Sequence, residues 1–188
     1  MAGGRAWHAG ALNMTPTDSP STQHRSVAPM NIRVREAGFD DAQLVADMTR
    51  AAWSGKVVVT SSGHRETAVR VLQDLQDGGG FILLRDEEPV GSVRWIPVDS
   101  EPSIWEVVRM GVLPACRGEH LSQHLLEAVI HRALASEVTE LRLAVRADQA
   151  RLLDLYAAFG FELAPELEYT HTNAIEPAPT VMRRMLGY

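Results

Sequence analysis

The sequence predicts one mixed α/β domain whose first half is antiparallel and whose second half alternates helices with strands. From Asn31 onward, the hydrophobic pattern changes repeatedly between the period of a strand and the period of a helix. Two apolar runs flank residues 85–89, a pattern typical of a hairpin. The 188 residues, 45% of them hydrophobic, suffice for one domain with a sizeable core.

The first half is expected to hold four strands and two helices. Alternation at residues 32–36 predicts a strand, and Asp40 with Gln43 has the pattern of a capping pair that opens the first helix. The second helix ends at three consecutive glycines, 78–80. Three strands follow, and Pro114 ends the last of them because proline cannot donate a ladder hydrogen bond. We expect these strands at 81–84, 90–97 and 104–112.

The second half begins with a long amphipathic helix at residues 121–135 and an alternating strand at 140–146. Asp148 is expected to cap a further helix that ends before Gly160. Two last strands, 161–163 and 180–186, flank a polar loop. The resulting order, β-α-α-β-β-β-α-β-α-β-β, is that of a mixed sheet with a crossover helix.

Residues 1–29 are expected to form a disordered tail. They contain prolines and a run rich in serine and threonine, and they show no sustained hydrophobic period. Translation from Met14 or Met30 is an alternative explanation for this segment. The remaining residues, 30–188, form the predicted domain.

The chain is acidic, and nearly all of its cations are arginines. Its 24 acidic and 18 basic side chains give a net charge of −6, with Lys56 as the only lysine. The tail contributes Arg5, Arg25 and Asp18, so the domain itself carries a net charge of −7. This balance argues against a duplex nucleic-acid partner and favours a cationic small molecule as a substrate.

The single cysteine and the lack of long apolar runs favour a location in the cytoplasm. Cys116 has no partner for an intramolecular disulfide or a CxxC motif, which fits a reducing cytoplasm. No uninterrupted apolar run approaches the roughly 20 residues that cross a bilayer. We therefore expect a cytoplasmic protein without a membrane or nucleic-acid partner, and we leave a homodimer open.

Residues 107–126 combine a strand, a turn broken by proline, an Arg-Gly pair and the first turn of a helix. Such a turn leaves several backbone N–H groups without intrahelical partners and directs the positive end of the helix dipole outward. This arrangement suits a phosphate or pyrophosphate. Gly118 allows the backbone to approach closely, and Arg117 adds a permanent cation.

This segment resembles motif A of the GNAT superfamily of acyl-CoA N-acyltransferases, in which Arg/Gln-x-x-Gly-x-Gly/Ala follows a strand ending in Val-x-Pro. Here His120 and Ser122 stand where the family usually has glycine and then glycine or alanine. A residue with a Cβ at position 120 is not strained if its backbone has ordinary helical angles.

A second segment, residues 146–161, is similar to the family signature Asn-x-x-Ala-x-x-x-Tyr-x-x-x-Gly-Phe. Gln149 and Leu152 replace its asparagine and alanine, whereas Tyr156 matches its tyrosine. The order of elements from Asn31 to Tyr188 also matches the family fold.

The resemblance implies the GNAT fold, with a sheet that splays between its fourth and fifth strands, and acetyl-CoA as the co-substrate without a metal. The free backbone groups of the fourth strand would pair with the pantetheine arm, and the following loop would hold the phosphates. The residues expected to contact acetyl-CoA are Met110, Gly111, Val112, Arg117, Gly118, Glu119, His120, Leu121, Ser122, Gln149 and Tyr156.

Two residues are candidates for the proton transfers. Tyr156 aligns with the tyrosine that is often the general acid in this family, and an aromatic core residue is the alternative. Glu106 is the candidate base, expected on the same strand face as Val108 and Met110. Apolar surroundings disfavour the charged form of a carboxylate, which suits a base. A solvated glutamate at a strand end is the alternative.

The segment between the first two helices commonly forms part of the acceptor pocket in this family. Trp53, Ser62 and His64 are therefore expected to line it, with scattered polar loop residues as the alternative. One helical stripe has the spacing of a zinc site but lies opposite the apolar face, so a solvated surface is favoured. The stripe consists of His120, His124, Glu127 and His131.

We interpret the sequence as that of a GNAT-type acetyltransferase that transfers an acetyl group from acetyl-CoA to a primary amine by direct attack. The acceptor is a small molecule or a peptide. One alternative is a catalytically silent GNAT-like domain that binds an acyl-CoA or acts as an interaction module. Another is a hydrolase with Cys116 as its nucleophile.

Overall fold

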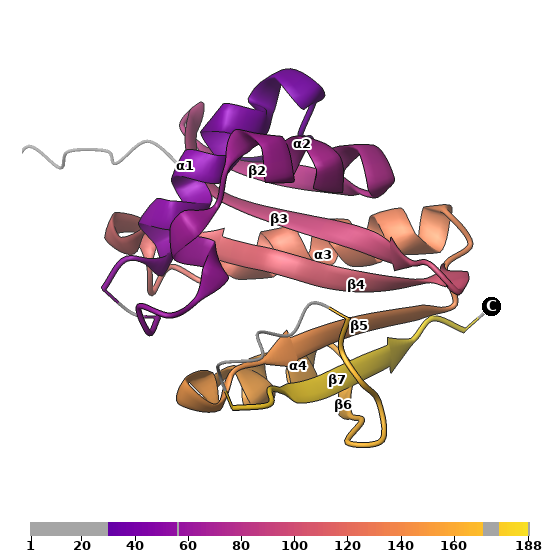
Figure 1. The fold of residues 1–188 in the computed structure, drawn as a ribbon. Helices are drawn as coiled ribbons and strands as arrows, with labels where there is room; N and C mark the ends of the chain where they lie inside the picture. The colour runs from indigo at the N-terminus through magenta and orange to yellow at the C-terminus, as the bar shows by residue number, and fades with distance from the viewer. Residues whose placement is uncertain (1–29, 56, 171–176, 188) are drawn as a thin grey trace, which may run out of the picture.

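The computed structural model describes residues 30–55, 57–170 and 177–187, so the expected tail, 1–29, lies outside the described residues. The strands form one sheet in the order β1-β2-β3-β4-β5-β7-β6 (Figure 1). Neighbouring strands run antiparallel except for β4 and β5, which are parallel. The mixed α/β class and the predicted order of elements are confirmed.

The strands of the described chain are β1 (Ile32–Glu36), β2 (Gly79–Arg85), β3 (Glu88–Val98), β4 (Glu101–Val112), β5 (Glu140–Val145), β6 (Glu162–Leu163) and β7 (Thr180–Met185). Its α-helices are α1 (Ala42–Trp53), α2 (Ala68–Asp77), α3 (Leu121–Ala135) and α4 (Leu152–Ala158). Short 3-10 turns are η1 (Phe39–Asp41), η2 (Ser62–Arg65), η3 (Pro114–Cys116) and η4 (Ala147–Gln149).

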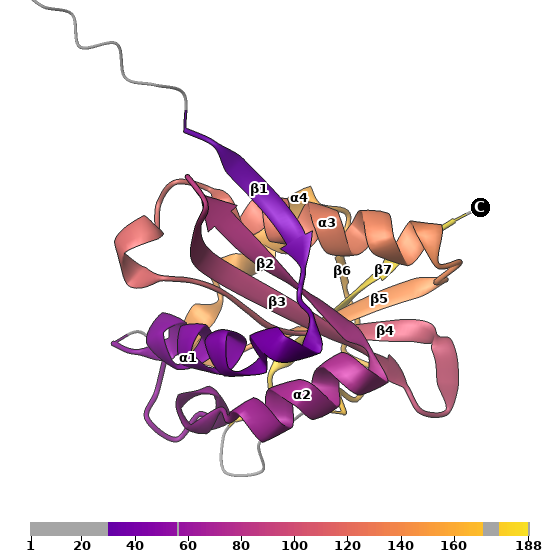
Figure 2. The ribbon, with the colours of Figure 1, turned by 90° about the horizontal axis from the view of Figure 1, so that it is seen from above.

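Helices cover both faces of the sheet, with α1 and α2 on one face and α3 and α4 on the other (Figure 2). Under α1 and α2, the buried Val45 and Val71 pack with Ile82 of β2. The larger cluster lies under α3, where Trp95 and Trp105 stack with their ring centroids 5.3 Å apart. Each face of the sheet therefore has its own apolar core.

Two predicted helix starts are wrong by a few residues. Asp41, not Asp40, precedes α1, and its carboxylate accepts hydrogen bonds from the Gly38 N–H and from Arg35. Asp148 does not cap α4, because its carboxylate pairs with Arg146 at 3.1 Å and residues 147–149 form η4 instead. At α4 the neighbouring Arg146 thus binds the carboxylate that the pattern assigned to helix capping, whereas at α1 the start is one residue later than predicted.

The three consecutive glycines are shared between a helix end and a strand. Gly78 ends α2, while Gly79 and Gly80 already belong to β2. A Cβ on Gly78 would lie 2.0 Å from the carbonyl oxygen of Trp95. Glycine is required there because the end of α2 lies directly against β3.

The sheet splays between β4 and β5, as the resemblance implied. These strands pair only where Ile104–Glu106 faces Glu140–Arg142. Beyond that point β4 continues along β3 and β5 continues along β7, and the two strands diverge (Figure 1). The divergence leaves one edge of β4 and one edge of β5 facing a common space.

Within the described residues, no helix is both long and apolar enough to cross a membrane.

Candidate active site

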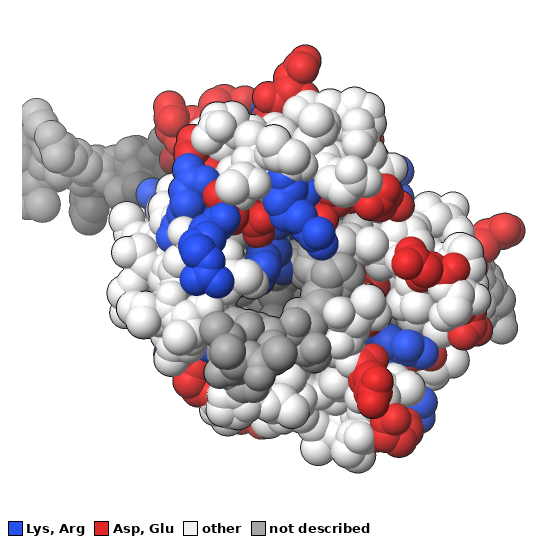
Figure 3. Space-filling model, in the orientation of Figure 1, with Lys and Arg blue, Asp and Glu red and all other residues white. Residues whose placement is uncertain are grey.

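A cavity of about 290 Å³ opens where β4 and β5 diverge. Figure 3 shows a hollow on this face, with blue arginine side chains gathered beside it. The walls come from α1, the turn before α2, the open halves of β4 and β5, and α4. Sequence segments far apart in the chain therefore meet at the splayed edge.

A bulge in β4 shapes the wall of this cavity. Arg94 of β3 pairs with Val108 and Ser92 pairs with Gly111, so one β3 residue faces both Arg109 and Met110. Arg109 has a φ of 55°, in the left-handed region. A bulge of this kind bends the strand and redirects a side chain.

The bulge overturns one expectation from strand alternation. Met110 was expected on the same face as Glu106, but it packs against the core cluster under α3. Arg109 takes the α2 side instead, where its Nε lies 2.8 Å from Glu66 Oε2. The extra residue in β4 changes which side chains face the cavity after position 108.

The loop before α3 has the backbone expected of an anion-binding turn. Gly118 has a φ of 85° and a Cβ there would meet no atom within 4 Å. His120 also lies in the left-handed region, with a φ of 58°, so the condition under which a Cβ there is unstrained, ordinary helical angles, is not met. His120 keeps a conformation that glycine adopts more easily.

No side chain caps the N-terminus of α3 among the described residues. The first N–H groups of a helix lack intrahelical partners, so they are available to an anion at this end. Arg117, just before the loop, lines the cavity and donates a hydrogen bond to the carbonyl of Ala52. The uncapped turn, the open space at Gly118 and this guanidinium fit the phosphates of acetyl-CoA.

The expected acetyl-CoA contacts divide into two groups. The cavity wall includes Met110, Gly111, Val112, Arg117, Gln149 and Tyr156. The others, residues 118–122, form the adjacent loop and first turn of α3. In this second group, Leu121 is buried in the core and Glu119 pairs with Arg85 at 2.9 Å, so their backbones rather than their side chains are available.

Tyr156 projects from α4 into the cavity wall and is 8% exposed. Its ring packs edge-on against Phe161, with centroids 6.1 Å apart. Burial raises the pKa of Tyr156 to about 12, because the phenolate is poorly solvated there. The phenol therefore carries its proton at neutral pH.

Glu106 does not line the main cavity. It is 1% exposed, and its Oε1 accepts hydrogen bonds from the N–H and the hydroxyl of Thr170, both at 2.9 Å. It borders a smaller neighbouring cavity of about 160 Å³, whose lining shares Arg70 and Asp74 with the main cavity. The buried position contradicts the alternative of a solvated strand-end glutamate.

The expected acceptor residues are only partly brought together. Trp53 and Ser62 line the cavity, but His64 does not. The His64 Nε2 lies 3.0 Å from the carbonyl oxygen of Val57 and 3.1 Å from that of Val58. His64 therefore holds the loop after α1 in place.

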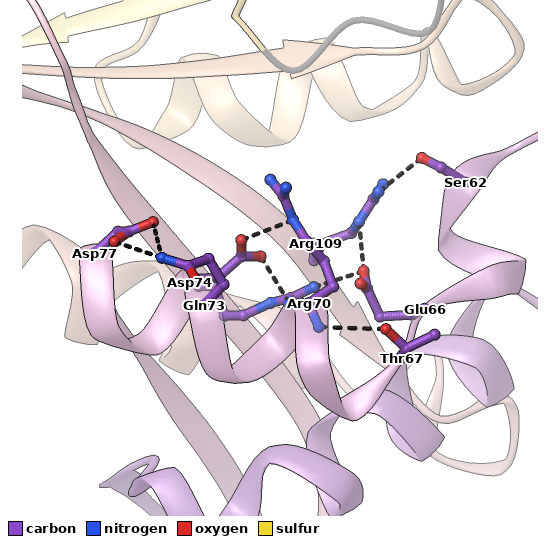
Figure 4. A network of polar contacts seen from close by, with 9 residues as sticks. Ser62, Glu66, Thr67, Arg70, Gln73, Asp74, Asp77 and Arg109 are labelled. Atoms are coloured by element: carbon purple, nitrogen blue, oxygen red, sulfur yellow. Dashed lines mark hydrogen bonds and ion pairs between the residues drawn. The ribbon is translucent and has the colours of Figure 1, made fainter.

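A buried ionic network under the cavity was not predicted from the sequence (Figure 4). Arg94, only 1% exposed, places Nη2 2.8 Å from Glu66 and Nη1 2.8 Å from Asp74. Arg109 shares Glu66, and Arg70 shares Asp74. Three guanidinium groups and two carboxylates thus join α2 to β3 and to the β4 bulge.

A hydrolase with Cys116 as its nucleophile and a zinc site on the histidine stripe find little support in the described residues. Cys116 is buried at 4% exposure, packed in the core cluster under α3. No group of three or more histidine, cysteine or acidic residues there could hold a metal ion. Along the histidine stripe, His124 Nδ1 lies 3.8 Å from Glu127 on the exposed side of α3.

The family described as Acetyltransferase (GNAT) family matches residues 45–161, more than half of the chain. The chain belongs to the GNAT acetyltransferase family. This GNAT match includes α1, the splayed strands, the loop before α3 and α4.

Two curated GNAT-family relatives are similar in sequence. A mycothiol acetyltransferase from Streptomyces griseus is 33% identical over 138 residues, which cover 72% of this chain and 44% of that protein. An IAA acetyltransferase from Azospirillum brasilense is 31% identical over 133 residues, which cover 68% of this chain and 81% of that protein. The chain thus spans less than half the length of the first relative.

Solved structures share the GNAT fold at low identity. PaiA N-acetyltransferase from Thermoplasma acidophilum, in complex with coenzyme A, has a TM-score of 0.67 and 15% identity, covering 83% of this chain and 99% of that one. A phosphinothricin acetyltransferase from Sinorhizobium meliloti, in complex with acetyl-CoA, has a TM-score of 0.66 and 17% identity, covering 83% and 89%. These likenesses concern the fold.

Proposed function

We propose that this GNAT protein transfers an acetyl group from acetyl-CoA to a primary amine by direct attack. The observation that carries the proposal is the cavity at the splay, whose wall holds the open edge of β4, Arg117 of the loop before the uncapped α3, and Tyr156. Acetyl-CoA supplies a thioester carbonyl that a neutral amine can attack.

The residues that support acetyl-CoA binding lie on two adjacent surfaces. Beyond Glu106, β4 has no partner on β5. The Val107 carbonyl there accepts a hydrogen bond from the Tyr169 hydroxyl at 2.9 Å, and the edge of β4 beyond it supports a place for the pantetheine arm. The loop from Arg117 to His120 and the first turn of α3 are available to the phosphates. Backbone N–H groups near the reacting carbonyl can stabilise the charge that develops on its oxygen.

Tyr156 and Glu106 are the proposed proton donor and acceptor. Tyr156 holds a proton at Oη at neutral pH, since its pKa is about 12, and gives it to the departing thiolate. Glu106 receives the proton that the amine loses, by way of the smaller cavity beside the main one. As the C–N bond forms, the nitrogen loses one proton to Glu106, and as the C–S bond breaks, the sulfur gains one proton from Tyr156.

Calorimetric titration of the full chain with acetyl-CoA tests this proposal, with dephospho-CoA and ATP as controls. We expect selective binding in the micromolar range, about −8 kcal/mol. Thiol release with a panel of primary amines then tests transfer, and mass spectrometry of the product identifies an added acetyl group. Absence of binding, or release of thiol without an acetylated amine, would overturn the proposal.

A further inference from the structure

The described lining of the main cavity is strongly cationic, with five arginines and a single acid. Arg117 lies in the loop before α3, where we place the phosphates. Arg146 and Arg151 lie in the β5–α4 connection, where Arg146 pairs with Asp148 and Arg151 donates a hydrogen bond to Gln149. The other two, Arg70 and Arg109, come from α2 and from the β4 bulge. These two need an explanation of their own.

Arg109 is held in place by both its backbone and its side chain. Its φ of 55° costs free energy for a residue with a Cβ, and the surrounding strands maintain it. The side chain is fixed by Nε to Glu66 at 2.8 Å and by Nη2 to Ser62 Oγ at 2.7 Å. Among the described residues, Nη1 has no hydrogen-bond partner, and the side chain is 29% exposed. One donor group is therefore positioned at the cavity without an acceptor among the residues that the structure describes.

Arg70 adds a second guanidinium on the same side of α2 (Figure 4). Its Nε lies 3.0 Å from Asp74 Oδ1, while its terminal nitrogens contact no acid within residues 30–55, 57–170 and 177–187. Arg94, which is buried, also pairs with both Glu66 and Asp74. The network of three cations and two carboxylates thus keeps one positive charge in excess, on its cavity side.

We propose that Arg109, assisted by Arg70, binds a carboxylate of the acceptor, so that the acceptor is an amino-carboxylate such as an amino acid. The inference rests on the acetyl transfer proposed above and names the substrate class for that same cavity. Arg109 Nη1 can donate to one oxygen of a carboxylate, and a terminal nitrogen of Arg70 can donate to the other, in charge-assisted hydrogen bonds. Bound there, the acceptor lies beside the open edge of β4 and on the wall that Tyr156 shares.

The proposal departs from the cationic acceptor that the net charge of −6 favours. Exposed charges act weakly beyond the Debye length of about 8–10 Å, whereas charges inside a cavity are screened much less. The two cavity arginines therefore outweigh the acidic surface in choosing the acceptor.

A binding experiment that needs no turnover tests the carboxylate site. The full chain is titrated, with and without coenzyme A, with N-acetylglycine, N-acetylleucine and N-acetylphenylalanine and with their carboxamides. We expect at least one carboxylate to bind about 10- to 100-fold more tightly than its carboxamide, since a charge-assisted pair is lost in the amide. Equal affinities in every pair overturn the proposal.

Variants then assign the discrimination to the two arginines. Arg109→Gln should abolish the preference for the carboxylate, Arg109→Lys should keep part of it, and Arg70→Gln should reduce it severalfold. Arg33→Gln is the matched control, because Arg33 is exposed on β1 and pairs with Glu87 outside the cavity lining. If Arg109→Gln still prefers the carboxylate over the carboxamide as strongly as the unchanged protein, the proposal is overturned. If Arg109→Gln does not fold, the same undiminished preference in Arg70→Gln, a change at an exposed side chain, overturns it.

Turnover separates this proposal from acetyl transfer itself. Thiol release that prefers amines without a carboxylate would support acetyl transfer and overturn the carboxylate site. Selective carboxylate binding without thiol release from any amine would support the site and overturn acetyl transfer.

Discussion

Replacing His120 by glycine should stabilise the protein, because His120 has a left-handed backbone in the loop before α3. That conformation costs a residue with a Cβ about 1–2 kcal/mol, and glycine escapes this cost. Glycine loses about 0.5–1 kcal/mol through the greater freedom of the unfolded chain. The exposed imidazole makes one long contact, 3.4 Å to Gln123, so little else is lost. The net expectation is a gain of about 0.5–1 kcal/mol.

Thermal and urea denaturation of the full chain measure this gain. For a chain of this size, about 0.5–1 kcal/mol raises the Tm by roughly 1–4 °C. His131→Gly is the matched control: it makes the same replacement at an exposed position inside α3, where glycine should destabilise by a few tenths of a kcal/mol or more, up to about 1. If His120→Gly lowers stability as His131→Gly does, the strain argument for the loop is refuted.

Three further variants test the site and its support. Tyr156→Phe should lower kcat by about ten- to a thousandfold with unchanged acetyl-CoA affinity, measured by thiol release and calorimetry. Because the pKa of Tyr156 is about 12 when folded and 10.0 in the free side chain, the protein loses stability as pH rises between these values. Tyr156→Phe should lose less free energy of unfolding than the unchanged protein over this pH range, and an equal loss would contradict the argument that burial raises the pKa. Arg117→Ala should weaken acetyl-CoA binding in calorimetry; wild-type affinity would show that this side chain contacts no phosphate. Arg94→Met should cost up to about 3–5 kcal/mol in urea denaturation, because the buried Glu66 and Asp74 would keep only the partly exposed Arg109 and Arg70 as partners, and a loss below about 1 kcal/mol would contradict this.

The order of elements could be predicted because it follows from local periodicity, and the splay was implied by the resemblance of two motifs to the GNAT family. The loop from Arg117 to Ser122 was also located by its residues alone. The backbone angles of His120 could not be derived, since helical and left-handed conformations are both open to a histidine next to a helix. Its position in place of a family glycine was the available signal.

The bulge at Arg109 depends on pairing with β3, which no local pattern encodes. Strand alternation alone therefore misplaced Met110 and missed the arginine that faces the cavity. The ionic network has a clearer signal in the sequence. Asp74 shares the apolar face of α2 with Val71 and Leu75, and Arg94 interrupts an apolar strand. Opposite charges at two buried positions are a signal that they meet in the core.

The three-residue seam between β4 and β5 also has a consequence for the dynamics of the chain. With so few ladder bonds across it, separation of the two parts of the sheet requires less free energy than global unfolding and should appear as a distinct opening in hydrogen exchange. A ligand that contacts both strands opposes this opening by about 2.7 kcal/mol at one hundred times its Kd. Amide protection at the seam therefore reports occupancy of the cavity, and a mutation that loosens the seam will weaken ligand binding without touching the ligand.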